Sequence, residues 1–171
     1  MNAVVLAAGL GTRLQPLTNS IPKPAIKVAG KPLIRWTLDT LEAVGFDKII
    51  IKIFYLADKV ITAIGEDKHV DIIREDLLTG TAIFLKKIES KLENEFLVVN
   101  GDTITNLNFD DFVEFHLSQT SIASVFTKDD AIHTGGVYAF SKKVLHYIPE
   151  DDSFSIQQLM QALIDNGEPP A

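Results

Sequence analysis

The sequence predicts an α/β fold in which a mainly parallel sheet is covered by helices on both faces. Short apolar runs alternate along the chain with stretches in which apolar residues recur at helical spacing, and this alternation is typical of such folds. The chain has 171 residues, 46% hydrophobic and 23% charged, which is enough for a domain with a real core. We therefore expect a single domain over residues 1–171.

Six apolar or β-branched runs are the expected strands: Ala3–Leu6, Lys48–Phe54, Val70–Arg74, Phe96–Val99, Ile122–Phe126 and Val137–Phe140. A loop with four prolines follows the first strand, and a helix over residues 33–44 is expected to end at Gly45. The other expected helices are Leu56–Ile64, Thr79–Lys91, Phe109–Leu117, Lys142–Tyr147 and Ile156–Ile164. Residues 167–171 are expected to form a tail.

Charge and cysteine content argue against several classes of site. The formal net charge of −7 disfavours binding to a nucleic-acid backbone, which needs a dominant basic face. The absence of cysteine excludes disulfides and thiolate metal sites, and it fits a reducing cytoplasm. The apolar run at the start breaks at Gly9, far short of a membrane span, so we expect no membrane partner.

The turn after the first expected strand carries two glycines. In Ala8-Gly9-Leu10-Gly11-Thr12, small residues let backbone N–H groups approach an anion, as in a phosphate cradle. Arg13 follows at once, and Lys23 lies between Pro22 and Pro24, which restrict the backbone around it. Two cations directed at one cradle suit a triphosphate. Glycine turns are often only turns, however, and a single surface arginine or lysine is usually solvated.

A second candidate lies at the end of an expected strand. The run Phe96–Val99 leads directly into Asn100-Gly101-Asp102-Thr103. This places a carboxylate at the carboxyl end of a strand, which is where ligands bind in open α/β sheets. The alternative is structural, because Asn-Gly-Asp is also a good turn sequence.

These motifs resemble the opening of the sugar-1-phosphate nucleotidylyltransferases. The resemblance is carried by Leu6–Thr18, by Pro22-Lys23-Pro24 and by Val28–Leu33, and it covers residues 3–34. It implies a Rossmann-like, GT-A-like fold with three α/β/α layers and a mainly parallel mixed sheet. It also implies Mg²⁺-dependent transfer of a nucleoside monophosphate from a nucleoside triphosphate to a sugar 1-phosphate or similar phosphorylated acceptor, with release of pyrophosphate.

The resemblance further implies roles for individual residues. Arg13, Lys23 and Asp102 are the expected catalytic residues, and Asp102 is the expected Mg²⁺ ligand. Contacts to the nucleotide are expected from Leu6, Ala8, Gly9, Gly11, Thr12, Arg13, Lys23, Glu75, Gly80 and Asn100. Gly136 is expected to let the acceptor sugar approach the backbone. Because the attacking phosphate is already anionic, no general base is required, and we expect His116, His133 and His146 to be solvated or core residues.

Two departures from the family concern the acceptor and the metal. Relatives carry a longer segment with a Glu-Lys-Pro contact to the sugar phosphate where this chain has only Lys128–His133. The chain also ends at Ala171, before a segment that supplies a second magnesium carboxylate in relatives, so the source of that ligand is open. Leu78 stands where many relatives have glycine.

Two other functions therefore stay open beside the enzyme. One is a catalytically reduced, nucleotide-binding regulatory module of the same fold. The other is a molybdenum-cofactor-type nucleotidyltransferase, whose opening turn is similar. The sequence does not choose the base, the acceptor (hexose, heptose or muramate 1-phosphate, or phosphocholine) or a homo-oligomeric state.

Overall fold

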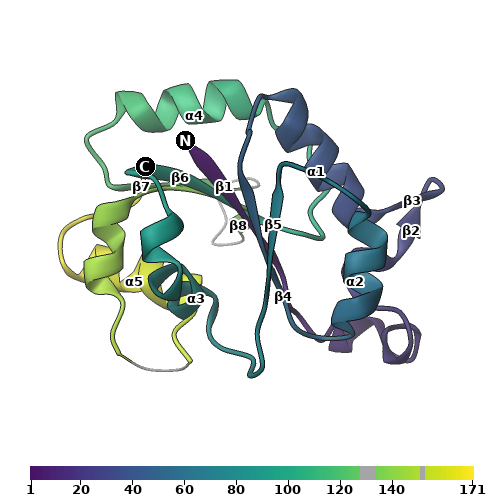
Figure 1. Cartoon of the computed structure of the whole chain (residues 1–171). Coiled ribbons are helices and arrows are strands. Elements are labelled where there is room, and N and C mark those ends of the chain that lie inside the picture. Colours follow the sequence, from purple (N-terminus) through teal and green to yellow (C-terminus); the bar gives the residue numbers. More distant parts are fainter. Residues whose placement is uncertain (128–133, 151–152) are drawn as a thin grey trace. The chain divides into compact units, whose positions relative to one another are not determined.

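A computed structural model describes residues 1–127, 134–150 and 153–171 (Figure 1). The strands of the main sheet are β1 (Asn2–Ala7), β4 (Ile49–Ile53), β5 (Val70–Arg74), β6 (Glu95–Asn100), β7 (Ala123–Thr127) and β8 (Thr134–Ser141). A separate hairpin is formed by β2 (Lys27–Val28) and β3 (Lys31–Pro32). The α-helices are α1 (Leu33–Ala43), α2 (Ala57–Ile64), α3 (Thr81–Lys87), α4 (Phe109–Ser118) and α5 (Ile156–Asp165). The 3₁₀ helices are η1 (Thr12–Leu14), η2 (Leu17–Asn19), η3 (Lys23–Ala25), η4 (Glu89–Lys91) and η5 (Lys142–Tyr147).

The main sheet has six strands in the order β5-β4-β1-β6-β8-β7. Strand β1 pairs in parallel with β4, and β4 pairs in parallel with β5. Strands β7 and β8 are antiparallel. The predicted α/β class with a mainly parallel mixed sheet is therefore confirmed.

By its contacts the chain divides into two compact units. The first, here called the N-terminal unit, consists of Ala3–Leu78 and Val99–Asn106. The second, the C-terminal unit, consists of Met1–Asn2, Thr79–Val98 and Leu107–Ala171. The single domain over residues 1–171 stays a prediction.

The core of the N-terminal unit is built on β1 and β4. All five residues of β4 are buried, and the apolar side of α1 supplies Ile34, Leu38 and Leu41, none of which has exposed surface. Helices α1 and α2 lie side by side (Figure 1). The chain leaves α1 at Ala43, and Gly45 takes a φ of +93°, a left-handed conformation that glycine adopts without steric cost. The predicted helix stop at Gly45 is thus confirmed.

Local capping explains where helices of the C-terminal unit begin. The Asn108 side chain accepts hydrogen bonds from the N–H groups of Asp110 and Asp111 at the start of α4. Ser155 and Gln158 form a reciprocal capping box at the start of α5. Helices α3 and α5 lie side by side (Figure 1).

The predicted helix Thr79–Lys91 was too long at both ends. The N–H groups of Ala82 and Ile83 donate to the carbonyl oxygen of Phe154, which satisfies the first turn and fixes the start of α3 at Thr81. Beyond Ile88 the chain continues as η4, with hydrogen bonds over three residues instead of four. The predicted helix Lys142–Tyr147 is likewise a 3₁₀ helix, η5.

The last residue of the chain, Ala171, forms backbone hydrogen bonds with strand β7. The N–H of Ala171 donates to Ala123 O at 2.9 Å, and the N–H of Val125 donates to Ala171 O at 3.0 Å. The segment predicted as a tail is therefore paired with a strand at its last residue. In the part of the chain that the structure describes, no helix combines the length and the apolar character that crossing a membrane requires.

Candidate functional site

The turn after β1 is held by contacts within the N-terminal unit. Gly11 has a φ of +66°, and its carbonyl oxygen accepts a hydrogen bond of 2.8 Å from Thr18 Oγ1. A Cβ on Gly11 would lie 2.9 Å from Thr18 Cγ2. The Tyr55 hydroxyl donates to Thr18 O at 2.9 Å and ties the loop to the end of β4. The loop's own packing therefore accounts for glycine at position 11.

Gly9 is different from Gly11. Its φ is outside the left-handed region, and an added Cβ would meet no atom within 4 Å. Neither backbone strain nor contact with the chain's own described atoms requires glycine there. The surface above Gly9 is open, as a turn that admits a ligand to its backbone needs to be.

The strand-end motif lies against β1. The N–H of Gly101 donates to Leu6 O at 2.9 Å, and the N–H of Thr103 donates to Asn100 O at 3.1 Å. A Cβ on Gly101 would lie 3.0 Å from the Ala7 Cβ and 3.1 Å from Val5 Cγ1, so glycine lets the turn approach the strand this closely. The structure thus brings the two motifs singled out in the sequence together.

Lys23 and Asp102 form an ion pair. The Lys23 Nζ is 2.5 Å from Asp102 Oδ2, and the two side chains are 38% and 30% exposed. Lys23 opens η3, after the extended Pro22, and Pro24 is buried, so the prolines set the direction of this segment. Two residues proposed from sequence for phosphate and metal are therefore in direct contact.

The surroundings of Asp102 fit a hard cation that is shared with a phosphate chain. Its carboxylate is partly exposed, and the Lys23 ammonium beside it is a partner for phosphate oxygens. Mg²⁺ often takes one or two carboxylates together with phosphate oxygens and water. Within the described ranges no group of three or more His, Asp and Glu side chains could hold a metal by itself. A metal here would therefore be bound jointly by Asp102 and the nucleotide.

Arg13 lies on η1 and is exposed. Among the residues that the structure describes, its side chain has no hydrogen bond or ion pair. Thr12, on the same short helix, is also exposed, whereas Ala8 is buried and Leu6 is half-buried. The guanidinium is therefore available to an anion beside the turn.

The sequence interpretation missed Lys52. This lysine is the fourth residue of β4, its side chain is 1% exposed, and its Nζ lies 2.8 Å from Glu75 Oε2. The Glu75 side chain is 8% exposed, and the Glu75 N–H donates to Ile53 O at 3.0 Å. The available signal was a single lysine inside an otherwise isoleucine-only strand. Glu75, proposed for the nucleotide, is therefore held by a buried cation.

Gly80 and Gly136 belong to the C-terminal unit. A Cβ on Gly80 would lie 2.2 Å from Phe154 O, so packing alone requires glycine there. Gly136 has a φ of +76°, and the pairing of β8 with β7 shifts register between Phe126 and Thr127. Both glycines have structural reasons, and their proposed ligand contacts stay predictions. The segment 128–133, where the acceptor lysine of relatives is missing, lies outside the described residues.

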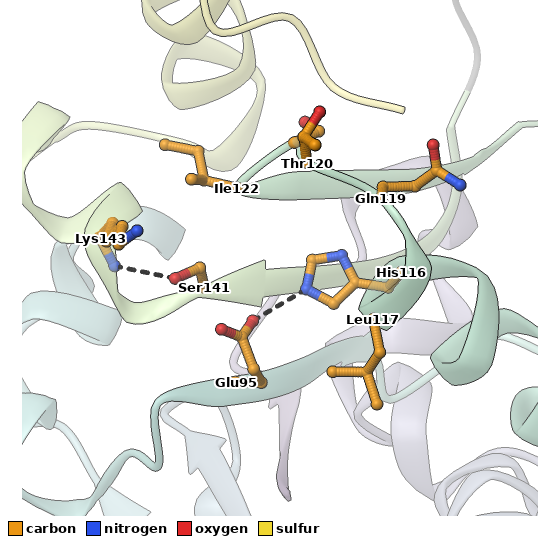
Figure 2. A pocket seen from close by; sticks show the side chains of 9 residues that line it. Glu95, His116, Leu117, Gln119, Thr120, Ile122, Ser141 and Lys143 are labelled. Atoms are coloured by element: carbon orange, nitrogen blue, oxygen red, sulfur yellow. Dashed lines mark hydrogen bonds and ion pairs between the residues drawn. The ribbon is translucent and has the colours of Figure 1, made fainter.

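A cavity of about 180 Å³ lies in the C-terminal unit, and none of its lining residues is among those proposed for the site (Figure 2). It is lined by Glu95, His116, Leu117, Gln119, Thr120, Ser121, Ile122, Ser141 and Lys143. The His116 ring points toward Glu95, with Nε2 3.0 Å from Glu95 Oε2 (Figure 2). Its Nδ1 lies 2.9 Å from Ser124 Oγ.

This Ser-His-Glu arrangement is structural. Ser124 has no exposed surface, so its hydroxyl could not reach a substrate. His116 is 3% exposed and is a core histidine, while His146 is exposed and bonds the Lys143 carbonyl. His133 lies outside the described residues.

Shifted pKa values in the N-terminal unit lie at a cluster on α1. The Arg35 guanidinium contacts Asp39 at 2.5 Å, Asp67 at 2.7 Å and Glu42 at 3.3 Å. Burial and a hydrogen bond with Asp67 raise the pKa of Glu42 above its ordinary value. Burial opposes ionisation of Asp67, but hydrogen bonds from Arg35, Glu42 and the His69 N–H lower its pKa. The cluster joins α1 to the segment after α2.

Known proteins identify the family. The sequence profile of the Nucleotidyl transferase family matches residues 2–135. A UTP–glucose-1-phosphate uridylyltransferase of Synechocystis is 27% identical over 219 residues, covering 99% of this chain and 56% of that protein. The crystal structure of HddC from Yersinia pseudotuberculosis, complexed with GMP-PN, is 30% identical and superimposes with a TM-score of 0.72 over 91% of this chain and 83% of that one.

A further structure supports the fold alone. A putative glucose-1-phosphate thymidylyltransferase from Bacillus anthracis is 20% identical, with a TM-score of 0.83 over 99% of this chain and 85% of that one. The chain spans about half, or less, of the length of the curated relatives that it matches. The family profile covers most of the chain and includes both the glycine turn and the Asp102 motif. The chain therefore belongs to the nucleotidyl transferase family, whose relatives include sugar-phosphate nucleotidylyltransferases.

Proposed function

We propose that this protein transfers a nucleoside monophosphate from a nucleoside triphosphate to a sugar 1-phosphate or similar phosphorylated acceptor, with Mg²⁺ and release of pyrophosphate. The observation that carries the proposal is the Lys23–Asp102 pair, which lies in the same compact unit as the open turn at Gly9. A carboxylate for a metal, cations for phosphate and an accessible backbone are the parts that this chemistry needs.

The bonds that change define what the protein has to do. An oxygen of the acceptor phosphate attacks the α-phosphorus, and the bond from that phosphorus to the oxygen bridging it to the β-phosphate breaks. Pyrophosphate leaves with the electron pair of that bond. The attacking oxygen is already anionic, so no proton has to be removed. Positioning and charge stabilisation therefore carry the reaction.

Residues of the N-terminal unit divide these tasks. Backbone N–H groups of the turn at Gly9 and Gly11 would bind phosphate oxygens, with Leu6, Ala8, Thr12 and Asn100 around the nucleotide. Arg13 and Lys23 would balance the charge that develops on the triphosphate. Asp102 would hold Mg²⁺, which neutralises phosphate charge when bound. Glu75 would contact the nucleoside. The contacts expected from sequence for Gly80 with the nucleotide and for Gly136 with the acceptor stay predictions.

The relatives support a nucleotide substrate, but they include a glucose-1-phosphate uridylyltransferase and a mannose-1-phosphate guanylyltransferase, which differ in base and sugar. HddC was crystallised in complex with GMP-PN, whereas the Synechocystis relative is a UTP–glucose-1-phosphate uridylyltransferase. The base and acceptor therefore have to be found by testing.

Pyrophosphate release tests the proposal directly. Each common nucleoside triphosphate is assayed with Mg²⁺ against hexose, heptose and muramate 1-phosphates and phosphocholine, using wild type and Asp102→Asn. Asp47→Asn is the matched control, because the Asp47 side chain is 94% exposed. Release that needs both an acceptor and Asp102 supports the enzyme. Tight triphosphate binding without release favours the regulatory module, and absence of binding refutes both.

A further inference from the structure

A buried ion pair lies one strand away from the glycine turn. The ammonium of Lys52 and the carboxylate of Glu75 are 2.8 Å apart, and their side chains are 1% and 8% exposed. The register of β1 and β4 places Lys52 opposite Leu6, so these two side chains project from the same face of the sheet. The pair is therefore beside the strand that leads into the turn at Gly9.

Stability alone gives no reason for this pair. Burying two charges is costly, and replacing a buried ion pair by apolar residues of similar size is often neutral or stabilising. The other four residues of β4 are buried isoleucines, so an apolar side chain suits this strand. A function that needs a fixed carboxylate would explain the lysine.

The backbone also fixes Glu75. Its N–H continues the pairing of β5 with β4 by donating to Ile53 O, directly after β5 ends at Arg74. The next three residues, 76–78, are exposed. At the point where the chain leaves the sheet, strand pairing thus fixes the Glu75 backbone and the ion pair with Lys52 holds its carboxylate.

We propose that Lys52 is a positioning residue that keeps the Glu75 carboxylate ionised and oriented to accept a hydrogen bond from the nucleoside. An ionised carboxylate only accepts, so it selects a ligand with a donor there: a base N–H or a ribose hydroxyl. A site built around such a bond strongly rejects analogues that lack the donor. The inference rests on the proposed function and deepens it, because it assigns the nucleoside end of the substrate to this pair.

The decisive variant removes both charges. Lys52→Met/Glu75→Met is expected to melt close to wild type and to bind the nucleoside triphosphate about 10- to 100-fold more weakly, the range for losing a hydrogen bond to a charged group. Its affinity for tripolyphosphate, which has no nucleoside, is expected to stay at the wild-type value. The single variant Lys52→Arg keeps a cation beside Glu75 and is therefore expected to keep the wild-type nucleotide affinity.

Ligand analogues identify the donor. The wild type is titrated with the 2′-deoxynucleotide and with a base-modified nucleotide that lacks one N–H. One of the two analogues is expected to bind the wild type more weakly than the parent nucleotide does. This loss of affinity is expected to vanish in the double variant. If the double variant does not fold, Glu75→Gln is compared with the wild type on the same analogues, because glutamine keeps the shape and can still accept from Lys52.

Each outcome has one meaning. The role of Lys52 is overturned if the double variant binds the nucleotide with wild-type affinity. It is also overturned if the analogue loses the same affinity, relative to the parent nucleotide, in the wild type and in the variant that folds. A wild type that binds neither nucleotide nor tripolyphosphate contradicts the proposed function itself. A variant that loses nucleotide and tripolyphosphate equally shows a purely structural pair.

Discussion

Removal of the Lys23 ammonium is expected to change metal and nucleotide binding in opposite directions. In Lys23→Met, Asp102 loses the cation 2.5 Å away and becomes a stronger site for Mg²⁺ in the absence of nucleotide. The two side chains are 38% and 30% exposed, so solvent screens the pair and its strength is about 0.2–1 kcal/mol. Free Mg²⁺ affinity should therefore rise by about 1.4- to 5-fold. Triphosphate affinity should fall by roughly tenfold or more, because Lys23 no longer meets phosphate.

Calorimetric titration of the ligand-free protein with Mg²⁺, and then with nucleotide, measures both changes. The same substitution in an Asp102→Asn background is the control, and there Lys23→Met should leave Mg²⁺ binding unchanged. The melting temperature should fall by no more than about 4 °C, since less than about 1 kcal/mol is lost. A parallel loss of Mg²⁺ and nucleotide affinity would refute the reasoning, because it would mean that Lys23 only maintains the loop.

Three other predictions concern activity, packing and pH. Arg13→Ala should lower kcat by roughly two orders of magnitude in the pyrophosphate assay, as loss of one preorganised donor does, and unchanged turnover would remove Arg13 from the mechanism. Gly9→Ala should change the free energy of unfolding by no more than about 0.5 kcal/mol and yet bind triphosphate weakly. Gly80→Ala, with a backbone oxygen 2.2 Å from the new Cβ, should lower the free energy of unfolding by about 1–3 kcal/mol or more. Equal melting temperatures of the two variants would contradict this contrast. The pKa of the Glu42 carboxyl is raised in the folded protein. Glu42 therefore stabilises the fold below the pKa that its carboxyl has in the unfolded chain, and this stabilisation is lost as the pH rises through its pKa in the folded protein. Glu42→Gln, which can still bond Asp67, should therefore raise the melting temperature at neutral pH but not in acid, and a pH-independent effect would exclude this cause.

Local patterns were sufficient for most of the fold. The strand at Val70–Arg74 was predicted at its observed bounds, and the helix that ends before Gly45 was predicted because its apolar spacing and glycine stop are both local. The hairpin at Lys27–Val28 and Lys31–Pro32 was not, since strands of two residues carry no period. The start of α3 depends on Phe154, which is 73 residues further along the chain than Thr81. No local pattern contains that contact.

In the candidate site, too, local patterns predicted single residues but not the contacts between residues distant in the sequence. Lys23 and Asp102 could be proposed separately, because each sits in a short motif with its own chemistry. Their pairing could not, since it depends on how the proline-rich loop folds back. Lys52 was missed because its partner, Glu75, is reached only through the register of β4 with β5. A charged residue inside an apolar strand indicates a buried charge that needs a partner, and this was the signal available in the sequence.

Glycine motifs combine two requirements that only coordinates separate. At Gly11 and Gly101 an added methyl group would lie about 2.9 Å from other side chains, so the fold itself requires glycine whether or not a ligand binds. Gly80 is more constrained still, by a backbone atom. At Gly9 the described part of the chain imposes no such requirement, so a ligand that approaches the backbone is the physical reason that the proposed function supplies. Among these four glycines, substitution of Gly9 is therefore the cleanest test of nucleotide binding, because its effect on the ligand is not mixed with an effect on packing.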